Sequence, residues 1–382
     1  LDYTLSGSGF SCFFPNPVSG VDFPGFLRYN KCRLPYFFYR YLLQKGMEVF
    51  PVKQMKGLIF LFALLIPVFA TGKVLLYVSG PEKMIGQVEA AFEAERGDVL
   101  EVFHTGSGPL MQKVWMEMTV GSIQADLVWG GEPMMYFSLA EKGVLQTYYP
   151  DDYDQLLEEY QYGDGFFTPV NSRFGTLICN PETVDPAAFP ASWEDLRDPR
   201  WAGKVAIADP SQSAMAFALM ASLYSLPGGR QIIESLGENG VFLAKQNIDA
   251  ISMVQSGEMD LCFAPHDGAF RLMKQASQKG LNTPLQILWP REGVFSVQRP
   301  IAIIQKARDE REEQWVKEFV DFAFSVRGQQ IAASFGFASV RKDLERIPGV
   351  PGGIKVLYTD WKQVWQQQSS LLDFFSSNVL EK

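Results

Sequence analysis

The sequence contains few of the side chains that most enzymes and metal proteins need. Only two of its 382 residues are histidines, His104 and His266, and only four are cysteines. Two imidazoles cannot build a histidine-rich zinc site, and no C-x-x-C pair or H-E-x-x-H motif is present. The sequence also lacks a G-x-x-x-x-G-K-[ST] phosphate loop, a complete G-x-G-x-x-G and a G-x-S-x-G nucleophile elbow. We therefore expect no catalytic residues, no metal site and no cofactor.

Positive charge is also scarce. The chain has 34 Lys and Arg residues against 43 Asp and Glu, a formal charge of −9. Contacts to nucleic-acid phosphates need clustered Lys and Arg, so this balance argues against nucleic acid as a partner. A hydrophobic content of 47% is too low for a protein with many membrane spans. The length exceeds what one compact core usually holds and predicts two domains.

The first 70 residues differ from the rest of the chain. They carry seven basic side chains against three acidic ones, a balance of +4, which leaves −13 on the other 312 residues. Met55-Lys56 precedes an apolar run at 58–70 that ends in small residues, as in a secretory signal peptide. We interpret residues 55–70 as a signal peptide and residues 1–54 as an upstream over-extension of the reading frame. The alternative is a genuine aromatic-rich arm ahead of a buried hydrophobic helix.

Two cysteines follow the predicted signal peptide, Cys179 and Cys262. Neither follows the apolar run directly, so the expected cleavage site has no cysteine for lipid attachment. We therefore expect a mature protein that is periplasmic and not anchored to a membrane. Both cysteines lie in apolar, strand-like runs. Their spacing is compatible with a disulfide in an oxidising compartment and equally with two buried free thiols.

From residue 73 onward, short β-rich runs alternate with helical segments. The pattern predicts strands at 74–78, 99–103, 126–129, 204–208, 259–264 and 301–304, and helices at 81–95, 109–119, 214–224, 269–277, 310–325 and 361–371. This alternation is typical of βαβ units, so we expect an α/β fold with a mostly parallel sheet. Functional residues should then lie at the carboxyl ends of the strands, where the helices begin.

Serines lie where several of these helices begin. Ser79 follows the first strand, Ser107 lies in a Thr-Gly-Ser-Gly turn at 105–108, and Ser211 and Ser213 follow the strand at 204–208. Unpaired backbone N–H groups and the positive end of the helix dipole favour an anion at such positions. Each serine is also an ordinary helix N-cap. An anion site therefore requires that these helix starts face one another.

A longer motif carries a family resemblance. The segment SWEDLRDPRWAGKVAIADP at 192–210 resembles the signature of the extracellular solute-binding proteins of ABC importers, in the subgroup that handles ferric iron, thiamine, phosphonates, polyamines and sugar phosphates. The phrases VQSGE at 254–258 and WPREG at 289–293 are also similar to that family. The likeness extends over most of residues 73–345.

The resemblance implies a two-lobed periplasmic binding protein of type II, with crossing hinge strands and a ligand cleft between the lobes. We place the crossings near 167–176 and 286–301. This division assigns residues 73–168 and 300–382 to lobe one and residues 169–299 to lobe two.

The resemblance also bears on the ligand. Ferric binders of this family use adjacent tyrosines in the second lobe, where this chain has no tyrosine between 262 and 270. The pair Tyr148-Tyr149 is interpreted as a packing feature. His266-Asp267 and Glu292 resemble the residues with which hexose-phosphate binders contact the sugar, and Arg173 could supply a bidentate cation for the phosphate. The alternatives are a helix cap for Asp267, an exposed loop charge for Glu292 and a hinge salt bridge for Arg173.

We therefore predict the periplasmic component of an ABC importer, not an enzyme, that captures a sugar phosphate or similar organophosphate by hinge closure. As a monomer it would deliver the solute to an inner-membrane permease. The predicted ligand-binding residues are Ser79, Thr105, Gly106, Ser107, Arg173, Ser211, Ser213, His266, Asp267 and Glu292. The alternatives are a ferric iron, thiamine or phosphonate binder of the same class, a receptor that signals through a membrane sensor, and a periplasmic hydrolase that uses Asp267 and Glu292 as an acid/base pair.

Overall fold

The computed structural model describes residues 72–347 and 353–381. The described residues belong to one compact unit that spans Thr71–Lys382. The predicted signal peptide at 55–70 and the predicted over-extension at 1–54 lie outside the described residues. Within the described ranges, no helix combines the length and the apolar character needed to span a bilayer.

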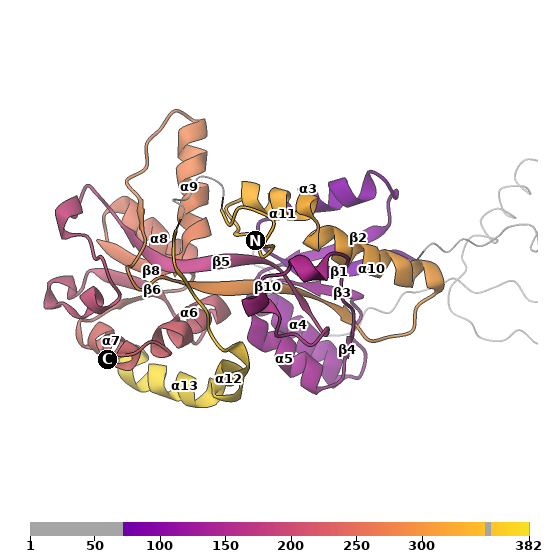
Figure 1. Cartoon of the computed structure of the whole chain (residues 1–382). Coiled ribbons are helices and arrows are strands. Elements are labelled where there is room, and N and C mark those ends of the chain that lie inside the picture. The colour runs from indigo at the N-terminus through magenta and orange to yellow at the C-terminus, as the bar shows by residue number, and fades with distance from the viewer. Residues whose placement is uncertain (1–71, 348–352, 382) are drawn as a thin grey trace, which may run out of the picture. The chain divides into compact units, whose positions relative to one another are not determined.

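One mixed β-sheet runs through the described part of the chain (Figure 1). Its main strand order is β2-β1-β3-β10-β5-β8-β6-β7, with β4 and β11 on β10 and β9 on β5. The strands are β1 (Val74–Ser79), β2 (Leu100–Thr105), β3 (Leu127–Trp129), β4 (Leu145–Gln146), β5 (Thr168–Cys179), β6 (Val205–Ala208), β7 (Phe242–Ala244), β8 (Leu261–Pro265), β9 (Gln286–Leu288), β10 (Val294–Ile304) and β11 (Val356–Leu357).

The sheet is parallel only toward its two ends. β1 pairs in parallel with β2 and β3, and β6 pairs in parallel with β7 and β8. In the middle, β5 and β10 are antiparallel to each other, and β10 is antiparallel to β3 and β5 to β8. The expectation of a mostly parallel sheet is therefore wrong at the centre, because these two long strands cross between the halves in opposite directions.

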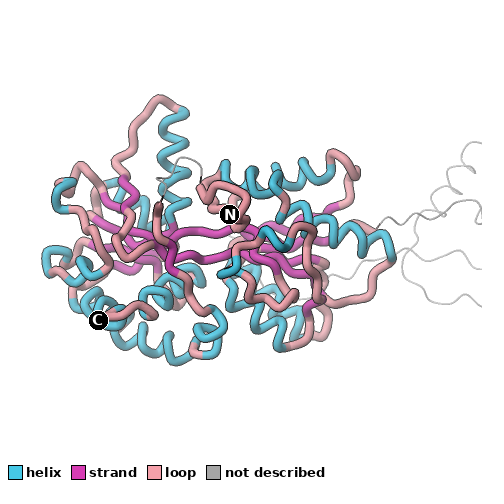
Figure 2. Tube along the Cα trace, viewed as in Figure 1, coloured by secondary structure: helices cyan, strands magenta, loops and turns pink. Residues whose placement is uncertain are grey.

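Helices cover both faces of each half of the sheet (Figures 1 and 2). They are α3 (Glu82–Glu93), α4 (Ser107–Thr119), α5 (Pro133–Glu141), α6 (Ala214–Tyr224), α7 (Gly229–Glu238), α8 (Asn247–Ser256), α9 (His266–Gln278), α10 (Glu310–Phe324), α11 (Val326–Ser334), α12 (Trp361–Gln366) and α13 (Gln368–Phe375). In the β1–β3 half, α3, α10 and α11 lie on one face and α4 and α5 on the other. In the β6–β8 half, α8 and α9 lie on one face and α6 and α7 on the other.

The alternation of side chains along each strand explains these layers. Leu76 and Val78 of β1 pack with Phe319 of α10 in one core, whereas Tyr77 between them packs with Val114 of α4 in another. Residues two apart share a face of a strand, so one strand supplies two cores. The crossing strands carry apolar residues on both faces, and this pattern is typical of strands covered on both sides.

The same alternation settles the state of the two cysteines. Cys179 lies opposite Leu261 in the β5–β8 ladder, and Cys262 lies opposite Ile178. Because neighbouring positions point to opposite faces, the two thiols enter different cores. Both cysteines are buried and free. Of the two readings that the sequence allows, the structure supports free thiols.

The C-terminal segment contacts both halves of the sheet. The indole N–H of Trp361 donates to Gln298 Oε1 of β10 at 2.7 Å, and that of Trp365 donates to Ser138 Oγ of α5 at 2.8 Å. Phe375 of α13 packs on Phe217 of α6, with 5.7 Å between the ring centroids. Residues 361–379 thus join the core under α6 and α7. The lobe bounds given above stay a prediction.

Candidate ligand-binding cleft

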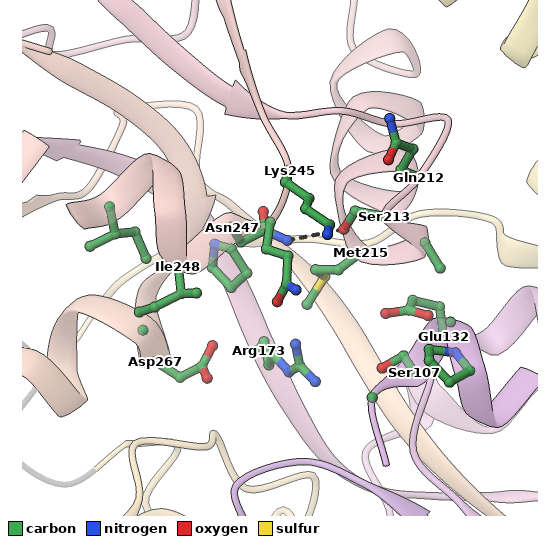
Figure 3. Close-up of a pocket in the computed structure, with 18 of the residues that line it drawn as sticks. Ser107, Glu132, Arg173, Gln212, Ser213, Met215, Lys245, Asn247, Ile248 and Asp267 are labelled. Carbon is green, nitrogen blue, oxygen red and sulfur yellow. Dashed lines mark hydrogen bonds between the residues drawn. The ribbon is translucent and has the colours of Figure 1, made fainter. Parts of the chain in front are cut away.

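Three adjoining cavities form a cleft where the two halves of the sheet meet. The main chamber has a volume of about 560 Å³, and its lining includes Ser107, Arg173, Ser213 and Asp267 (Figure 3). A cavity of about 380 Å³ shares Ser107, Arg173 and Asp267 with it. A third cavity of about 330 Å³, which we call the apolar chamber, shares Glu132 and Gln212 with the main chamber. These volumes suit a small solute.

Several helices begin at this cleft, as the strand–helix alternation predicts. Ser107 is the first residue of α4, Asn247 the first of α8 and Asp267 the second of α9. Ser213 caps α6, where its Oγ accepts a hydrogen bond from the Ala216 N–H at 3.2 Å. The first turns of these helices offer unpaired N–H groups and the positive end of the helix dipole. Together they make the cleft favourable for an anion, with α4 in one half of the sheet and α6, α8 and α9 in the other.

Three cationic side chains line the main chamber: Arg173 from β5, Lys245 after β7 and Arg271 from α9. Arg173 lies between Asp267 and Ser107 in the view of the chamber (Figure 3). Its Nε atom is buried and has no hydrogen-bond partner among the described residues. An arginine with free N–H groups in a cavity can bind a planar or tetrahedral oxyanion through two parallel hydrogen bonds.

Asp267 is a buried carboxylate held in its ionised form. Its side chain is 3% exposed, and Oδ2 accepts a hydrogen bond from Nη1 of Arg271, one helical turn further along α9. Burial alone would raise the pKa of Asp267, but the positive charges of Arg271 and Arg173 lower it to about 2. The second oxygen, Oδ1, has no partner among the described residues. It can therefore accept a hydrogen bond from a ligand.

A second buried carboxylate, Glu132, faces the cleft from the other half of the sheet (Figure 3). Burial raises its pKa, and the nearby Arg173 and Arg299 oppose that shift. Arg299 lies beneath the cleft on β10, 1% exposed, where it donates to Asn171 Oδ1 at 3.1 Å and to the carbonyl of Ser79. It also lies over the Phe337 ring, 5.0 Å from the centroid.

Most of the residues predicted from the sequence meet in this cleft. Those that line one or more of the three cavities are Thr105, Gly106, Ser107, Arg173, Ser211, Ser213 and Asp267. Ser211 lines the apolar chamber, with its hydroxyl donated to Asp209 Oδ1 at 2.7 Å. Arg173 is therefore placed as the ligand hypothesis requires, and no salt bridge to it is present among the described residues.

Three predicted residues lie outside the lining of these cavities. Ser79 is buried beneath the cleft, where its Oγ accepts from the Gly131 N–H at 3.2 Å. His266 is fully buried, and its Nδ1 accepts from the Phe174 N–H at 2.9 Å. Glu292 is half-buried in the loop between β9 and β10. Sequence reasoning cannot separate such supporting positions from the lining, because both follow strand ends.

Other lining residues were missed by the sequence reasoning. Glu132 follows β3 directly, so the strand-end rule could have found it. Lys245 and Asn247 follow β7, a three-residue strand that the pattern does not predict. Arg271 was missed because the sequence places the start of its helix at 269, whereas α9 begins at His266. Among the described residues, no cluster of three His, Cys, Asp or Glu side chains could hold a metal ion.

Comparisons with known proteins agree with this architecture. Residues 123–366 match the model of a family described as bacterial extracellular solute-binding protein. An uncharacterised protein of Haemophilus influenzae is 27% identical over 275 residues, which cover 69% of this chain and 76% of the relative. A Salmonella typhimurium protein, provisionally named a 2-aminoethylphosphonate-binding periplasmic protein, is 22% identical over 264 residues, 66% of this chain and 73% of the relative.

Solved structures show the same fold. Iron-bound HitA from Pseudomonas aeruginosa superposes with a TM-score of 0.68 at 20% identity, covering 80% of this chain and 99% of HitA. AfuA from Actinobacillus pleuropneumoniae, with bound fructose-6-phosphate, gives a TM-score of 0.67 at 23% identity and covers 81% of this chain and 98% of AfuA. The predicted α/β fold of a type II periplasmic binding protein is thereby confirmed.

Proposed function

Because this chain belongs to the bacterial extracellular solute-binding proteins, which capture small molecules for ABC permeases, we propose that it binds a small organic phosphate or phosphonate. From the importer class we infer a location in the periplasm and a role without a chemical step. We propose that it acts there as a monomer that closes over its solute and presents it to an inner-membrane permease.

The observation that carries this proposal is the unpartnered guanidinium of Arg173 in the main chamber, beside the starts of α4, α6 and α8. A phosphate or phosphonate group has oxygens in the geometry that arginine binds with two hydrogen bonds. The helix starts supply further N–H donors to the same group. Lys245 adds a third source of positive charge. The net negative charge of the protein acts over longer distances than these contacts. It slows the encounter with an anion but does not prevent binding.

Two carboxylates, one on each side of Arg173, offer acceptors to the rest of the ligand. Asp267 Oδ1 and Glu132 Oε2 have no partner among the described residues, and both residues line the main chamber. Carboxylate oxygens accept hydrogen bonds from hydroxyl or ammonium groups. This arrangement supports a sugar phosphate, such as the ligand of AfuA, or an amino-substituted phosphonate, such as that in the name of the Salmonella relative.

Ferric iron is the main rival solute, because HitA was solved with iron bound. A ferric ion requires several anionic oxygen ligands close together. In this cleft Arg271 forms an ion pair with Asp267, and Arg173 lies beside Asp267 (Figure 3). Those positive charges repel a trivalent cation, and they disfavour the cation thiamine for the same reason.

Calorimetric titration of the purified protein tests the proposal. The panel contains glucose 6-phosphate, fructose 6-phosphate, 2-aminoethylphosphonate, inorganic phosphate and ferric citrate. We expect micromolar or tighter binding of at least one organic anion, weakened about 10- to 100-fold in Arg173→Gln, because a charge-assisted bidentate contact contributes about 1.5–3 kcal/mol. The matched control is Arg200→Gln, at an exposed arginine outside the three cavities.

Two outcomes contradict the proposal. One is tight binding of ferric ion together with no response to any phosphate or phosphonate. The other is steady release of inorganic phosphate from a sugar phosphate, because a solute carrier leaves its ligand intact. Size-exclusion chromatography with light scattering checks the monomer.

A further inference from the structure

Glu132 occupies the junction between two chambers of the cleft. It lines both the main chamber and the apolar chamber, and its side chain is 2% exposed. In the close-up its carboxylate lies near Ser107, on the side of the chamber away from Ile248 and Asp267 (Figure 3). A ligand held on Arg173 between these groups therefore has Asp267 on one side and Glu132 on the other.

No hydrogen bond or ion pair among the described residues accounts for the buried Glu132, on which Arg173 and Arg299 act through their charge alone. Its Oε2 atom has no hydrogen-bond partner, and no ion pair joins Glu132 to another residue that the structure describes. It precedes α5 at the N-cap position but makes no side-chain capping bond there. The next residue is Pro133, which has no N–H to donate. An unpartnered buried acceptor costs free energy, so a donor that arrives with the ligand would remove that cost.

Beyond Glu132 the cleft continues into the apolar chamber. Six of its lining side chains are thioether, aromatic or aliphatic groups without a strong hydrogen-bond acceptor, namely Met111, Trp115, Met134, Met135, Phe217 and Leu372. The polar side chains of the lining are Glu132, Gln112, Ser138, Ser211, Gln212 and Gln368. Glu132 is the carboxyl group of this lining, and it therefore offers a donor group of the ligand an acceptor that the amides and hydroxyls do not match.

We propose that Glu132 is a specificity-determining residue, which accepts a hydrogen bond from a hydroxyl or ammonium group at the end of the ligand remote from its phosphate or phosphonate. This inference deepens the proposed function and rests on it. It narrows the solute class to bifunctional molecules, with an oxyanion for Arg173 at one end and a donor for Glu132 at the other. A simple alkyl phosphate or phosphonate leaves Glu132 buried and unpartnered, so the cleft discriminates against it.

The test compares ligands that carry a hydrogen-bond donor with ligands that lack one. The first series is 2-aminoethyl-, 2-hydroxyethyl- and propylphosphonate, which have nearly the same shape and carry an ammonium, a hydroxyl or a methyl group. The second pair is glucose 6-phosphate and methyl phosphate. We expect the full-length protein to bind a donor-bearing member of one of these sets at least tenfold more tightly than its donor-free counterpart, by calorimetry at pH 7.

Two substitutions separate the contributions of Glu132. Glu132→Leu should abolish the preference, with the affinity for the donor-free ligand unchanged or improved. Glu132→Gln keeps an amide oxygen as acceptor, so it should retain the preference for a hydroxyl but lose at least tenfold for an ammonium. The control is Glu141→Gln, which removes one negative charge from the exposed end of the same helix. If circular dichroism shows that Glu132→Leu does not fold, the test uses Glu132→Gln and the preference of the wild-type protein for donor-bearing ligands.

The outcomes distinguish this inference from the proposed function. Anion binding without any preference for donor-bearing ligands, or with a preference that both Glu132 variants retain, overturns the role of Glu132 and leaves the proposed function standing. A wild-type protein that binds none of the phosphates and phosphonates overturns the proposed function and this inference with it. A preference lost only in the Glu132 variants supports both.

Discussion

His266 and Phe174 form a direct link between a helix start and a crossing strand, in which the Phe174 N–H donates to Nδ1 of His266 at 2.9 Å. Phe174 lies within β5, and His266 is the first residue of α9. Nδ1 also lies 3.3 Å from the Phe174 carbonyl oxygen, so the ring is held against both backbone groups of this residue. Burial lowers the pKa of His266, although Asp267 next to it opposes the shift.

This link predicts acid-sensitive stability. The pKa of His266 is lowered in the folded protein, whereas an unfolded histidine titrates near about 6.5. The unfolded state therefore binds more protons below that pH, and the stabilising contribution, complete above it, is lost as the pH falls. We expect wild-type to lose up to about 1.4 kcal/mol per pH unit more than His266→Gln between pH 6.5 and 5. Urea unfolding of both proteins at three pH values measures this, and parallel profiles would contradict it.

We expect the Asp267 carboxylate to contribute to ligand affinity, even though it is already paired with Arg271. Asp267→Asn keeps the shape but removes the charge that accepts from a ligand hydroxyl or ammonium, and it leaves Arg271 without its ion pair. We predict a roughly tenfold loss of affinity, about 1.4 kcal/mol, because hydrogen bonds to charged groups are the stronger ones. Calorimetry with the best ligand of the panel measures the loss. Asp373→Asn, at an exposed position on α13, should bind like wild-type, and equal affinity of all three proteins would exclude Asp267 from the site.

The guanidinium of Arg299 is expected to hold the floor of the cleft together. Arg299→Met removes the hydrogen bonds to Asn171 and Ser79 and takes away one of the two positive charges near Glu132, the other being that of Arg173. Breaking a buried charged cluster in this way costs about 3–5 kcal/mol of the free energy of unfolding. Urea unfolding measures the cost. The exposed Arg230→Met serves as control, with a change of about 0.5 kcal/mol or less, and a similar small change in Arg299→Met would show that the cluster contributes little.

Gly130 tests the close packing beneath the cleft. Its φ is +103°, and a Cβ at this position would lie 2.8 Å from Nη2 of Arg299 and 2.5 Å from Oγ of Ser79. Gly97 has a similar φ of +83° but open space around the added carbon. Gly97→Ala should cost about 1–2 kcal/mol from backbone strain alone. Gly130→Ala should cost clearly more, and equal losses in thermal or urea unfolding would argue against a steric role for Gly130.

Local patterns in the sequence predict most of the regular elements. The helix expected at 214–224 coincides with α6, and the strand expected at 74–78 ends one residue before β1 does. The start of α9 is missed because Pro265 and Gly268 suggest a turn, whereas the proline only precedes the first helical turn. β10 begins seven residues earlier than the strand pattern predicts, and its first part falls in the region 286–301 where the family resemblance places a crossing.

The candidate site is predictable only in part, for a related reason. Arg173 is predicted because it lies beside the expected hinge, and Asp267 because it follows a predicted strand and matches a family resemblance; both line the main chamber. Glu132 and Lys245 approach the same chamber from opposite halves of the sheet. Their proximity depends on the antiparallel crossing of β5 and β10, and no local sequence pattern contains it. Glu292 illustrates the same limit: the sequence predicts it as a ligand contact, but its loop lies outside the lining of the three cavities.

The pairing of β5 with β10 also sets the order in which this protein can fold. Gly175 and Phe295, which are opposite each other in that ladder, are 120 residues apart in the chain. Strand pairing over such separations requires costly loop closure and is slow compared with helix formation. The β1–β3 half cannot complete its sheet until residues 294–304 have been synthesised, because β3 pairs with β10. Premature compaction of this half is thereby disfavoured.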